Sequence, residues 1–189
     1  MSPENTLKKL VDIQTAIDTA NIETLKKEHQ LKVSYFNDLK PTLQERDALL
    51  AEIDGFWDTV LISSECIDVL AEMENPEPAA VDISWIGGIR VEYREDFKYY
   101  IRMDVKENPY FENSVLEKEF SLFEDVPGTS TPIQWKGKKN LENPVMRFFM
   151  STEASDEDLN MSMLQIFSDV YFNAVYYYVR ADESEEEEE

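Results

Sequence analysis

The N-terminal stretch from Glu4 to Lys40 constrains the fold more than any other part of this chain. It contains no glycine and no proline, and apolar residues recur in it at three- and four-residue steps. On a helical wheel, one side carries Leu7, Leu10, Val11, Ile17, Ile22, Leu25, Tyr35, Phe36 and Leu39, while the other is mainly lysine and carboxylate side chains. This pattern predicts one uninterrupted amphipathic helix.

The predicted helix is longer than a compact globule of this chain is wide. At 1.5 Å per residue it measures roughly 55 Å, whereas a compact chain of 189 residues has a diameter of roughly 40 Å. A second copy could cover the apolar stripe, so we expect a homodimer. The six bases and six acids of the segment cancel, so two copies can meet without strong repulsion. The alternative is that the stripe packs on its own domain and the chain is monomeric.

The expected dimer contacts come from this stripe. They are Leu7, Leu10, Ile17, Leu25, Tyr35 and Leu39. In an antiparallel pair centred on Leu25, Asp18 would face Lys32 of the partner subunit, and this ion pair would help to set the register.

Cysteine and histidine are almost absent, which excludes several kinds of site. Cys66 is the single cysteine and lies in an apolar run typical of a core, while His29 is the single histidine and lies on the long helix. Zinc sites and histidine-based catalytic triads are therefore excluded, and we expect no metal, no cofactor and no enzymatic activity. Paired carboxylates of the glycosidase type remain an alternative, but a chain so rich in acids makes any one pair uninformative. The lack of a signal peptide or membrane-length apolar run favours a reducing, intracellular compartment.

Negative charge is distributed unevenly along the chain. The total is −22, of which residues 41–80 carry −9, residues 81–150 carry −2 and residues 151–189 carry −11. Such a field repels nucleic acid and anionic membranes and attracts strongly basic proteins, among which histones are the abundant class. The other interpretation is that the acidity only keeps the protein soluble.

The hydrophobic period changes from helical to alternating near Val81. Before it, Pro41 should stop or kink the long helix at Lys40, and shorter helices should follow over Thr42–Ile53 and from Phe56 to about Met73. After it, four segments read as antiparallel strands, at residues 89–94, 99–106, 115–123 and 132–136. A further helix should start at Ser155 and pack on the sheet, while residues 182–189 are too acidic to fold.

Residues 107–120, ENPYFENSVLEKEF, closely resemble the signature of the nucleosome assembly protein family of histone chaperones, and specifically its SET branch. Other segments resemble the branch in the same order along the chain. They are KPTLQERDALLAEIDGFW at 40–57, TPIQWK at 131–136, the pair Phe148 and Phe149, and the Glu-rich end.

The resemblance implies an α+β fold in a headphone-shaped homodimer. Residues 1–40 would form the long dimerisation helix, 41–181 an "earmuff" domain with a four-stranded antiparallel sheet packed by helices, and 182–189 a disordered acidic tail. It also implies that core histones bind an acidic surface, without sequence-specific binding of nucleic acid and without membrane binding. The protein would then work in the nucleus, shuttling with the cytoplasm. A second class is an adaptor that presents histones to a modifying enzyme or restrains a chromatin factor.

We expect the histone contacts to come from carboxylates in the acidic regions, with the tail as an auxiliary. They are Glu124, Asp125, Glu153, Asp156, Glu157, Asp158 and Asp169, together with Asp182 and Glu183. For Asp156 and Asp158, capping of a helix is an equally good explanation, and both roles can hold at once. Most of the signature residues Asn108–Asn113 are expected to be structural, because Asn-Pro forms turns and the aromatic pair can anchor a loop to the core.

Overall fold

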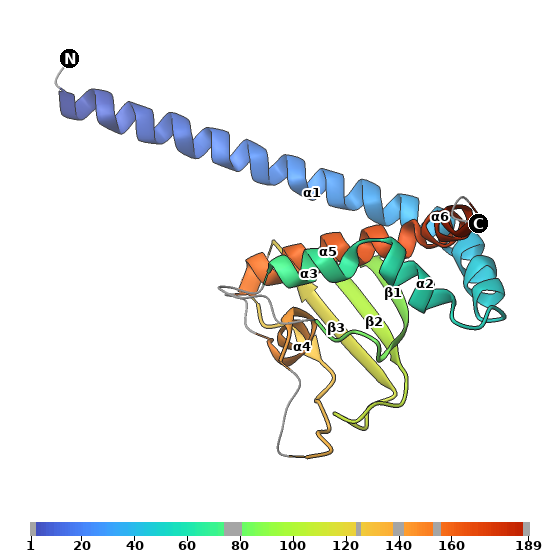
Figure 1. Cartoon of the computed structure of the whole chain (residues 1–189). Helices are drawn as coiled ribbons and strands as arrows, with labels where there is room; N and C mark the ends of the chain where they lie inside the picture. The colour runs from blue at the N-terminus through green and yellow to red at the C-terminus, as the bar shows by residue number, and fades with distance from the viewer. Residues whose placement is uncertain (1–2, 74–80, 124–125, 138–141, 153–155, 187–189) are drawn as a thin grey trace.

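A long helix leads into a sheet-and-helix domain in the computed structural model of this chain, which describes residues 3–73, 81–123, 126–137, 142–152 and 156–186 (Figure 1). In order, its elements are α1 (Pro3–Leu50), α2 (Phe56–Ser63), α3 (Cys66–Glu72), β1 (Ile86–Arg94), β2 (Lys98–Val105), β3 (Val115–Ser121), β4 (Thr129–Ser130), α4 (Pro144–Met150), α5 (Glu157–Phe172) and α6 (Ala174–Glu186). The predicted fold class, a long N-terminal helix followed by a four-stranded antiparallel sheet with helices, is confirmed.

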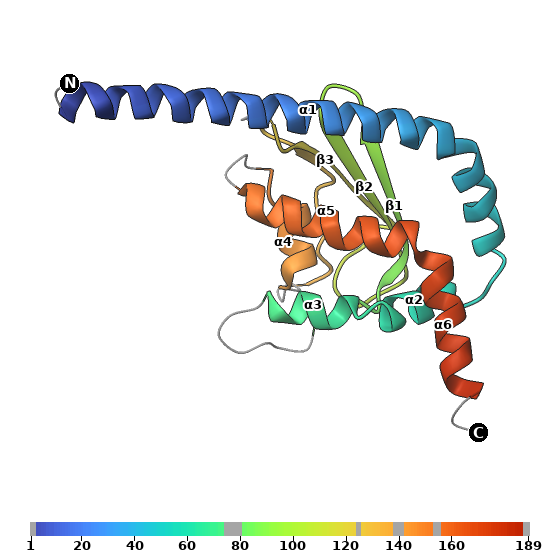
Figure 2. The same cartoon turned by 90° about the horizontal axis from the view of Figure 1, so that it is seen from above.

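Helix α1 continues through Pro41 and ends at Leu50, so the separate helix predicted for Thr42–Ile53 is wrong. A proline inside a helix removes one backbone hydrogen bond, costs ~3 kcal/mol and bends the axis. Figure 2 shows α1 changing direction in its last turns, the part that contains Pro41. Beyond the bend, Leu43 and Leu50 are buried in the core, and this packing offsets the cost of the proline.

The sheet has the order β1-β2-β3-β4 with antiparallel neighbours throughout. Its fourth strand is the short β4, whereas the sequence predicted 132–136. In that segment Pro132 has no amide hydrogen, and the side chain of Asn113 donates to the Pro132 carbonyl at 3.0 Å and accepts from the Gln134 amide at 2.8 Å. Among the described residues, the backbone of 134–136 pairs only with residues 110–112, through hydrogen bonds of 2.8 and 2.9 Å. Only Trp135 forms an isolated bridge, to Phe111.

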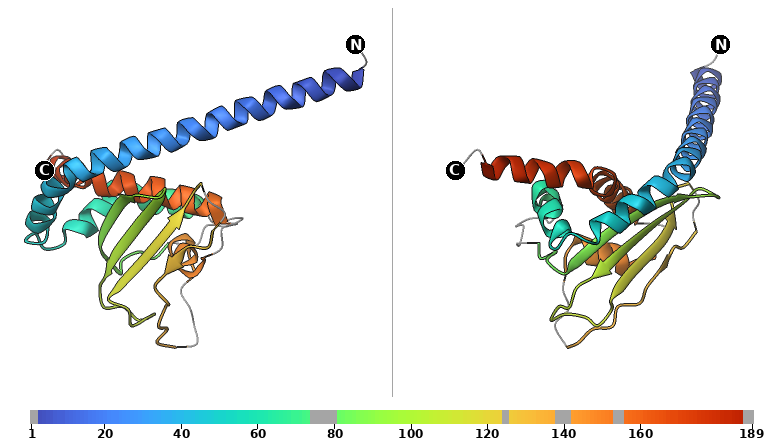
Figure 3. Two further views of the ribbon diagram at one scale, coloured as in Figure 1. Left: turned by 180° about the vertical axis from the view of Figure 1, so that it is seen from behind. Right: turned by 90° about the vertical axis from the view of Figure 1, so that its right-hand side faces the viewer.

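Helices cover one face of the sheet and leave the other face open (Figure 3). Alternate strand residues point to the covered side, such as Val91, Ile101 and Leu116, and they are fully buried against α4 and α5. Helix α4 brings Phe148 and Phe149 into this core. The single core therefore sits between one sheet face and the helical layer.

The signature segment makes structural contacts. The Asn108 side chain accepts from the amides of Tyr110 and Phe111, at 2.9 and 3.1 Å. The Tyr110 hydroxyl donates to Asp82 at 2.7 Å, and Phe111 packs edge-on to Trp85. These bonds fix the connection between β2 and β3, as its Asn-Pro turn suggested.

Helix α6 continues to Glu186, which is five residues into the segment 182–189 that the sequence predicted to be unfolded. The end of the last helix therefore does not coincide with the predicted boundary at Asp182. The two boundaries between the three predicted segments, after residues 40 and 181, remain predictions.

Candidate functional site

The N-terminal half of α1 extends beyond the globular domain with its apolar stripe uncovered (Figure 1). Five of the six predicted dimer contacts are exposed, namely Leu7, Leu10, Ile17, Leu25 and Tyr35. The sixth, Leu39, is partly buried against the core of its own domain. Phe36, which the helical wheel placed on the same stripe, is buried and packs edge-on to Tyr93.

A second apolar face of α1 attaches the helix to its own domain. It consists of His29, Val33, Phe36 and Leu43, spaced at three, four or seven residues. The His29 imidazole is 2 % exposed, and its Nε2 lies 3.0 Å from the Arg94 carbonyl. Because a carbonyl only accepts, Nε2 carries the proton in this contact.

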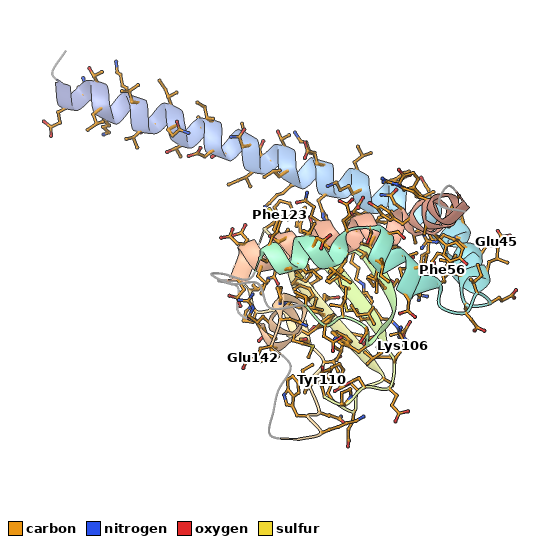
Figure 4. All side chains as sticks on the ribbon, in the orientation of Figure 1. Glu45, Phe56, Lys106, Tyr110, Phe123 and Glu142 are labelled. Atoms are coloured by element: carbon orange, nitrogen blue, oxygen red, sulfur yellow. The ribbon has the colours of Figure 1, made fainter. Side chains whose placement is uncertain are left out.

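Aromatic rings surround His29 at this attachment point. Tyr99 and Phe123 meet its ring edge-on, with centroids at 4.9 and 5.8 Å, and Phe97 lies at 5.5 Å. Figure 4 shows Phe123 beneath the middle of α1. Phe97 has a φ of 58°, a left-handed conformation that is uncommon for an aromatic residue, and the Lys26 ammonium lies 5.3 Å from its ring. Sequence analysis placed His29 on the helix but did not assign it this role, since its partners, from Arg94 to Phe123, are 65 or more residues away in the chain.

The open face of the sheet carries charges that cancel in pairs. Arg94 binds Glu119 at 2.7 Å, Lys98 binds the same carboxylate at 3.0 Å, and Arg102 binds Asp104 at 2.7 Å. Hydrogen bonds from Arg94 and Lys98 hold the pKa of Glu119 below its usual range. This face therefore offers little uncompensated charge to a partner.

The helical layer on the other side of the sheet has uncompensated acids. Asp156, Glu157 and Asp158 gather at the start of α5, where Glu157 and Asp158 are exposed. Asp156 occupies the N-cap position without a capping hydrogen bond, and its carboxylate instead accepts from the Ser151 hydroxyl. None of these carboxylates forms an ion pair with another described residue.

The remaining predicted contact residues are not gathered with these three. Asp169 lies near the other end of α5 and accepts from Asn173 and from the Tyr177 hydroxyl. Glu124, Asp125 and Glu153 lie outside the described residues. Asp182 and Glu183 lie within the residue range of α6.

Two further carboxylates of the helical layer lie on α3 and were not among the predicted contacts. Asp68 and Glu72 of α3 are exposed and form no ion pair with a described residue. The end of α3 and the start of α5 line one groove, through Met73 and Asp158. The net charge of residues 41–80 was the signal that could have pointed to them. We call Asp68, Glu72, Asp156, Glu157 and Asp158 the acidic helical surface.

A buried lysine lies beneath the start of α5. Lys118 of β3 is 1 % exposed, and its ammonium donates to the Phe148 carbonyl and to the Asn160 side chain, both at 2.7 Å. Burial lowers the pKa of Lys118 from 10.5 to about 8, although the nearby Asp156 carboxylate opposes this shift.

Neither a metal site nor a membrane-spanning helix is evident among the described residues. They contain no group of three or more histidine, cysteine or acidic side chains arranged to hold a metal ion. No helix in the described part of the chain combines the length and apolar character needed to cross a bilayer.

Comparison with known proteins decides the family. The family described as "Nucleosome assembly protein (NAP)" matches residues 50–149, more than half of the chain. The chain belongs to the nucleosome assembly protein family. Protein SET of Drosophila melanogaster is 34 % identical over 145 residues, covering 71 % of this chain and 52 % of its own length. NAP1-related protein 1 of Arabidopsis thaliana is 29 % identical, covering 74 % of this chain and 54 % of its own length. The chain thus spans about half the length of these two relatives.

Solved structures of the family share the fold. A nucleosome assembly protein from Plasmodium falciparum aligns with a TM-score of 0.55 at 24 % identity, over 93 % of this chain and 96 % of that one. Ccp1 aligns with a TM-score of 0.52 at 22 % identity, over 95 % and 97 %. The family and its SET branch, recognised from the signature at 107–120, are therefore confirmed.

Proposed function

We propose that this chain is a histone chaperone. It binds core histones as a homodimer through the acidic helical surface, and it assists the assembly or disassembly of nucleosomes in the nucleus, with shuttling to the cytoplasm. Membership of the nucleosome assembly protein family supports this function in general.

The observation that carries the proposal is the separation of charge between the two sides of the domain. Carboxylates on the open sheet face are paired with Arg94, Lys98 and Arg102, whereas those of α3 and the start of α5 have no ion pair with a described residue. Opposite charge attracts a basic partner only where it is not already neutralised. A histone would therefore meet the helical layer.

The dimer would bring two such surfaces together. The N-terminal end of α5 lies level with the middle of α1, and α6 lies near its C-terminal end, in both Figures 1 and 2. If two α1 helices pair antiparallel through the exposed stripe, the two acidic ends of α5 come to lie on either side of the two-fold axis. One histone dimer could then touch both domains, which raises affinity without any new type of contact.

The mechanism requires no catalysis. Carboxylates compete with DNA phosphates for lysine and arginine side chains, and the histone is transferred when DNA offers the denser charge. Binding should weaken steeply as salt concentration rises, because salt screens the charges and the release of bound counterions then gains less free energy.

The test is titration of the purified chain with each core-histone pair, the tetramer-forming central pair and the flanking dimer. Neutralising Asp68, Glu72 and Asp158 to the matching amides should weaken binding by about tenfold or more, since each exposed charge contact contributes roughly 0.5–1 kcal/mol.

The matched control removes the same number of charges beyond the bend of α1, at Glu45, Glu52 and Asp54. These side chains are exposed, and this end of the domain is opposite the start of α5 (Figures 1 and 4). The control variant has the same net charge as the test variant and should bind nearly as well as the natural chain. Equal losses in the two variants, or no complex of the natural chain with either histone pair at low salt, would refute the proposal.

A further inference from the structure

A groove opens where α3, α4 and α5 meet. It has a volume of about 640 Å³ and is lined by Met73, Arg147, Met150, Ser151, Asp156, Asp158, Leu159 and Ser162. Met73 follows α3, Met150 ends α4 and Leu159 lies in the first turn of α5, so segments more than eighty residues apart build one hollow. We call it the methionine groove.

Part of the groove wall is apolar. Met73, Met150 and Leu159 are three of its eight lining residues, and the Met150 side chain is 52 % exposed. Methionine has an unbranched, polarisable side chain that adapts to different partners, so it is well suited to a binding surface that must fit flexible side chains. Covering the exposed Met150 side chain with a partner would remove apolar surface from water and so stabilise the complex.

Carboxylates mark the rim of the same groove. Asp156 accepts a hydrogen bond from the Ser151 hydroxyl and lies near the buried ammonium of Lys118. Asp158 is exposed and has no ion pair with another described residue. Arg147 is the one basic side chain among the residues that line the groove. Glu157, between Asp156 and Asp158 in the sequence, is a third acid at the start of α5.

A ligand for this groove must therefore combine an apolar stem with a cationic head. Lysine and arginine side chains have this form, because their methylene stems cover apolar surface while the charged end reaches polar groups. An anionic side chain would meet carboxylates that outnumber the single arginine. A purely apolar one would leave the rim carboxylates partly desolvated without a partner.

We propose that the methionine groove seats one lysine or arginine side chain of the bound histone, with the stem against Met73 and Met150 and the charged end at Asp156 and Asp158. This inference rests on the proposed histone chaperone function. It adds to that function a contact that does not depend on charge alone, so part of the affinity should persist when salt screens the acidic helical surface.

The test compares two exposed methionines of the helical layer. Met150 lines the groove, whereas Met161 is 47 % exposed on α5 but is not among the lining residues. Met150→Ser should raise the dissociation constant for the histone about fivefold at both low and high salt, because the lost contact is apolar. Met161→Ser should leave it unchanged, and Met150→Leu should restore it. Asp158→Asn should weaken binding mainly at low salt.

The outcomes separate the two proposals. If the natural chain binds no histone, the proposed function fails. If it binds histones but Met150→Ser and Met161→Ser have the same affinity, or if the effect of Met150→Ser disappears at high salt, the groove is not a seat for a basic side chain. Circular dichroism of each variant confirms that it is folded, and the Met150→Leu variant excludes a general effect of changing this position.

Discussion

At the scale of single residues, Lys118 shows how strand geometry can place a charge in a core. Residues 116, 118 and 120 alternate toward the covered face of β3, so Lys118 must point inward between Leu116 and Phe120. Its ammonium lies 4.1 Å from the centre of the Phe148 ring and holds the end of α4 to β3. The alternation of apolar residues in the sequence predicts that Lys118 points inward. The groups that accept hydrogen bonds from its ammonium come from α4 and α5 and cannot be identified from β3 alone.

Lys118 should make the stability of the domain depend on pH in the alkaline range. Its pKa is about 8 in the folded chain and near 10.5 when unfolded, so between these values the unfolded state binds more protons and stability rises with pH. Between pH 8 and 9 the free energy of unfolding should increase by about 1 kcal/mol relative to Lys118→Met. Urea denaturation of both proteins at each pH measures this, and the comparison cancels the titration of Cys66 and the tyrosines. Parallel curves would show that the buried lysine keeps its ordinary pKa.

His29 is the second residue whose role is set by distant partners. His29→Ala removes the hydrogen bond to the Arg94 carbonyl and the ring contacts with Phe97, Tyr99 and Phe123. It should lower the free energy of unfolding by about 2–3 kcal/mol, measured by urea denaturation. Gln30→Ala is the control, since Gln30 is exposed on the same turn. A small and equal effect of both changes would mean that His29 does not hold α1 to the domain.

At the scale of elements, α1 uses two apolar faces for two purposes. The face with His29, Val33 and Phe36 packs on its own domain, and the face from Leu7 to Tyr35 remains exposed. The helical wheel merged the two faces because they are adjacent on the cylinder and differ only in what lies beside them. Without Phe36 and Leu39, the exposed stripe runs from Leu7 to Tyr35, and its midpoint is Asn21 and not Leu25, on which the expected pairing was centred.

The new midpoint gives a different register for the dimer. With the two-fold axis at Asn21, Leu7 faces Tyr35 of the partner subunit and Ile17 faces Leu25 of the partner subunit, so apolar residues meet along the helix. Asn21→Cys, in a chain with Cys66→Ala, should then form an intermolecular disulfide on oxidation. Leu25→Cys should not, because its two copies would be about 12 Å apart along the axis, beyond the reach of a disulfide. Cross-linking of Leu25→Cys but not of Asn21→Cys would instead support the register centred on Leu25.

At the scale of the whole molecule, the exposed stripe of α1 should determine both assembly and affinity. Leu10→Asp with Leu25→Asp places charges in the stripe and should give a particle of 22.0 kDa in sedimentation. The domain should stay folded, since its core uses α1 from His29 onward. Histone affinity should fall by about tenfold or more, because each particle then offers one acidic surface in place of two. Unchanged sedimentation would show that the stripe is not the dimer interface.

Much of the fold could be predicted from the sequence, because its signals are local. The uninterrupted helix, the alternation in β1 to β3 and the signature turn at Asn108 depend on neighbours in the chain. The errors came from contacts at long range. Packing of Leu43 and Leu50 carries α1 through Pro41, and the Asn113 side chain binds the backbone of the segment after Pro132. For the candidate site, the sequence places Asp156–Asp158 together at the start of α5, whereas Asp68 and Glu72 lie on α3, about ninety residues earlier in the chain, and sequence neighbours give no reason to group them with α5.

The ion-paired sheet face has a consequence for how cargo is oriented. A polycation approaching from that side finds each carboxylate already held by an arginine or lysine, such as Glu119 between Arg94 and Lys98. If the proposed function holds, capture would therefore be directional, and the open sheet face of each domain would stay uncovered while a histone is bound. A histone-bound dimer would therefore still present two uncovered sheet faces to a second protein that takes over the histone.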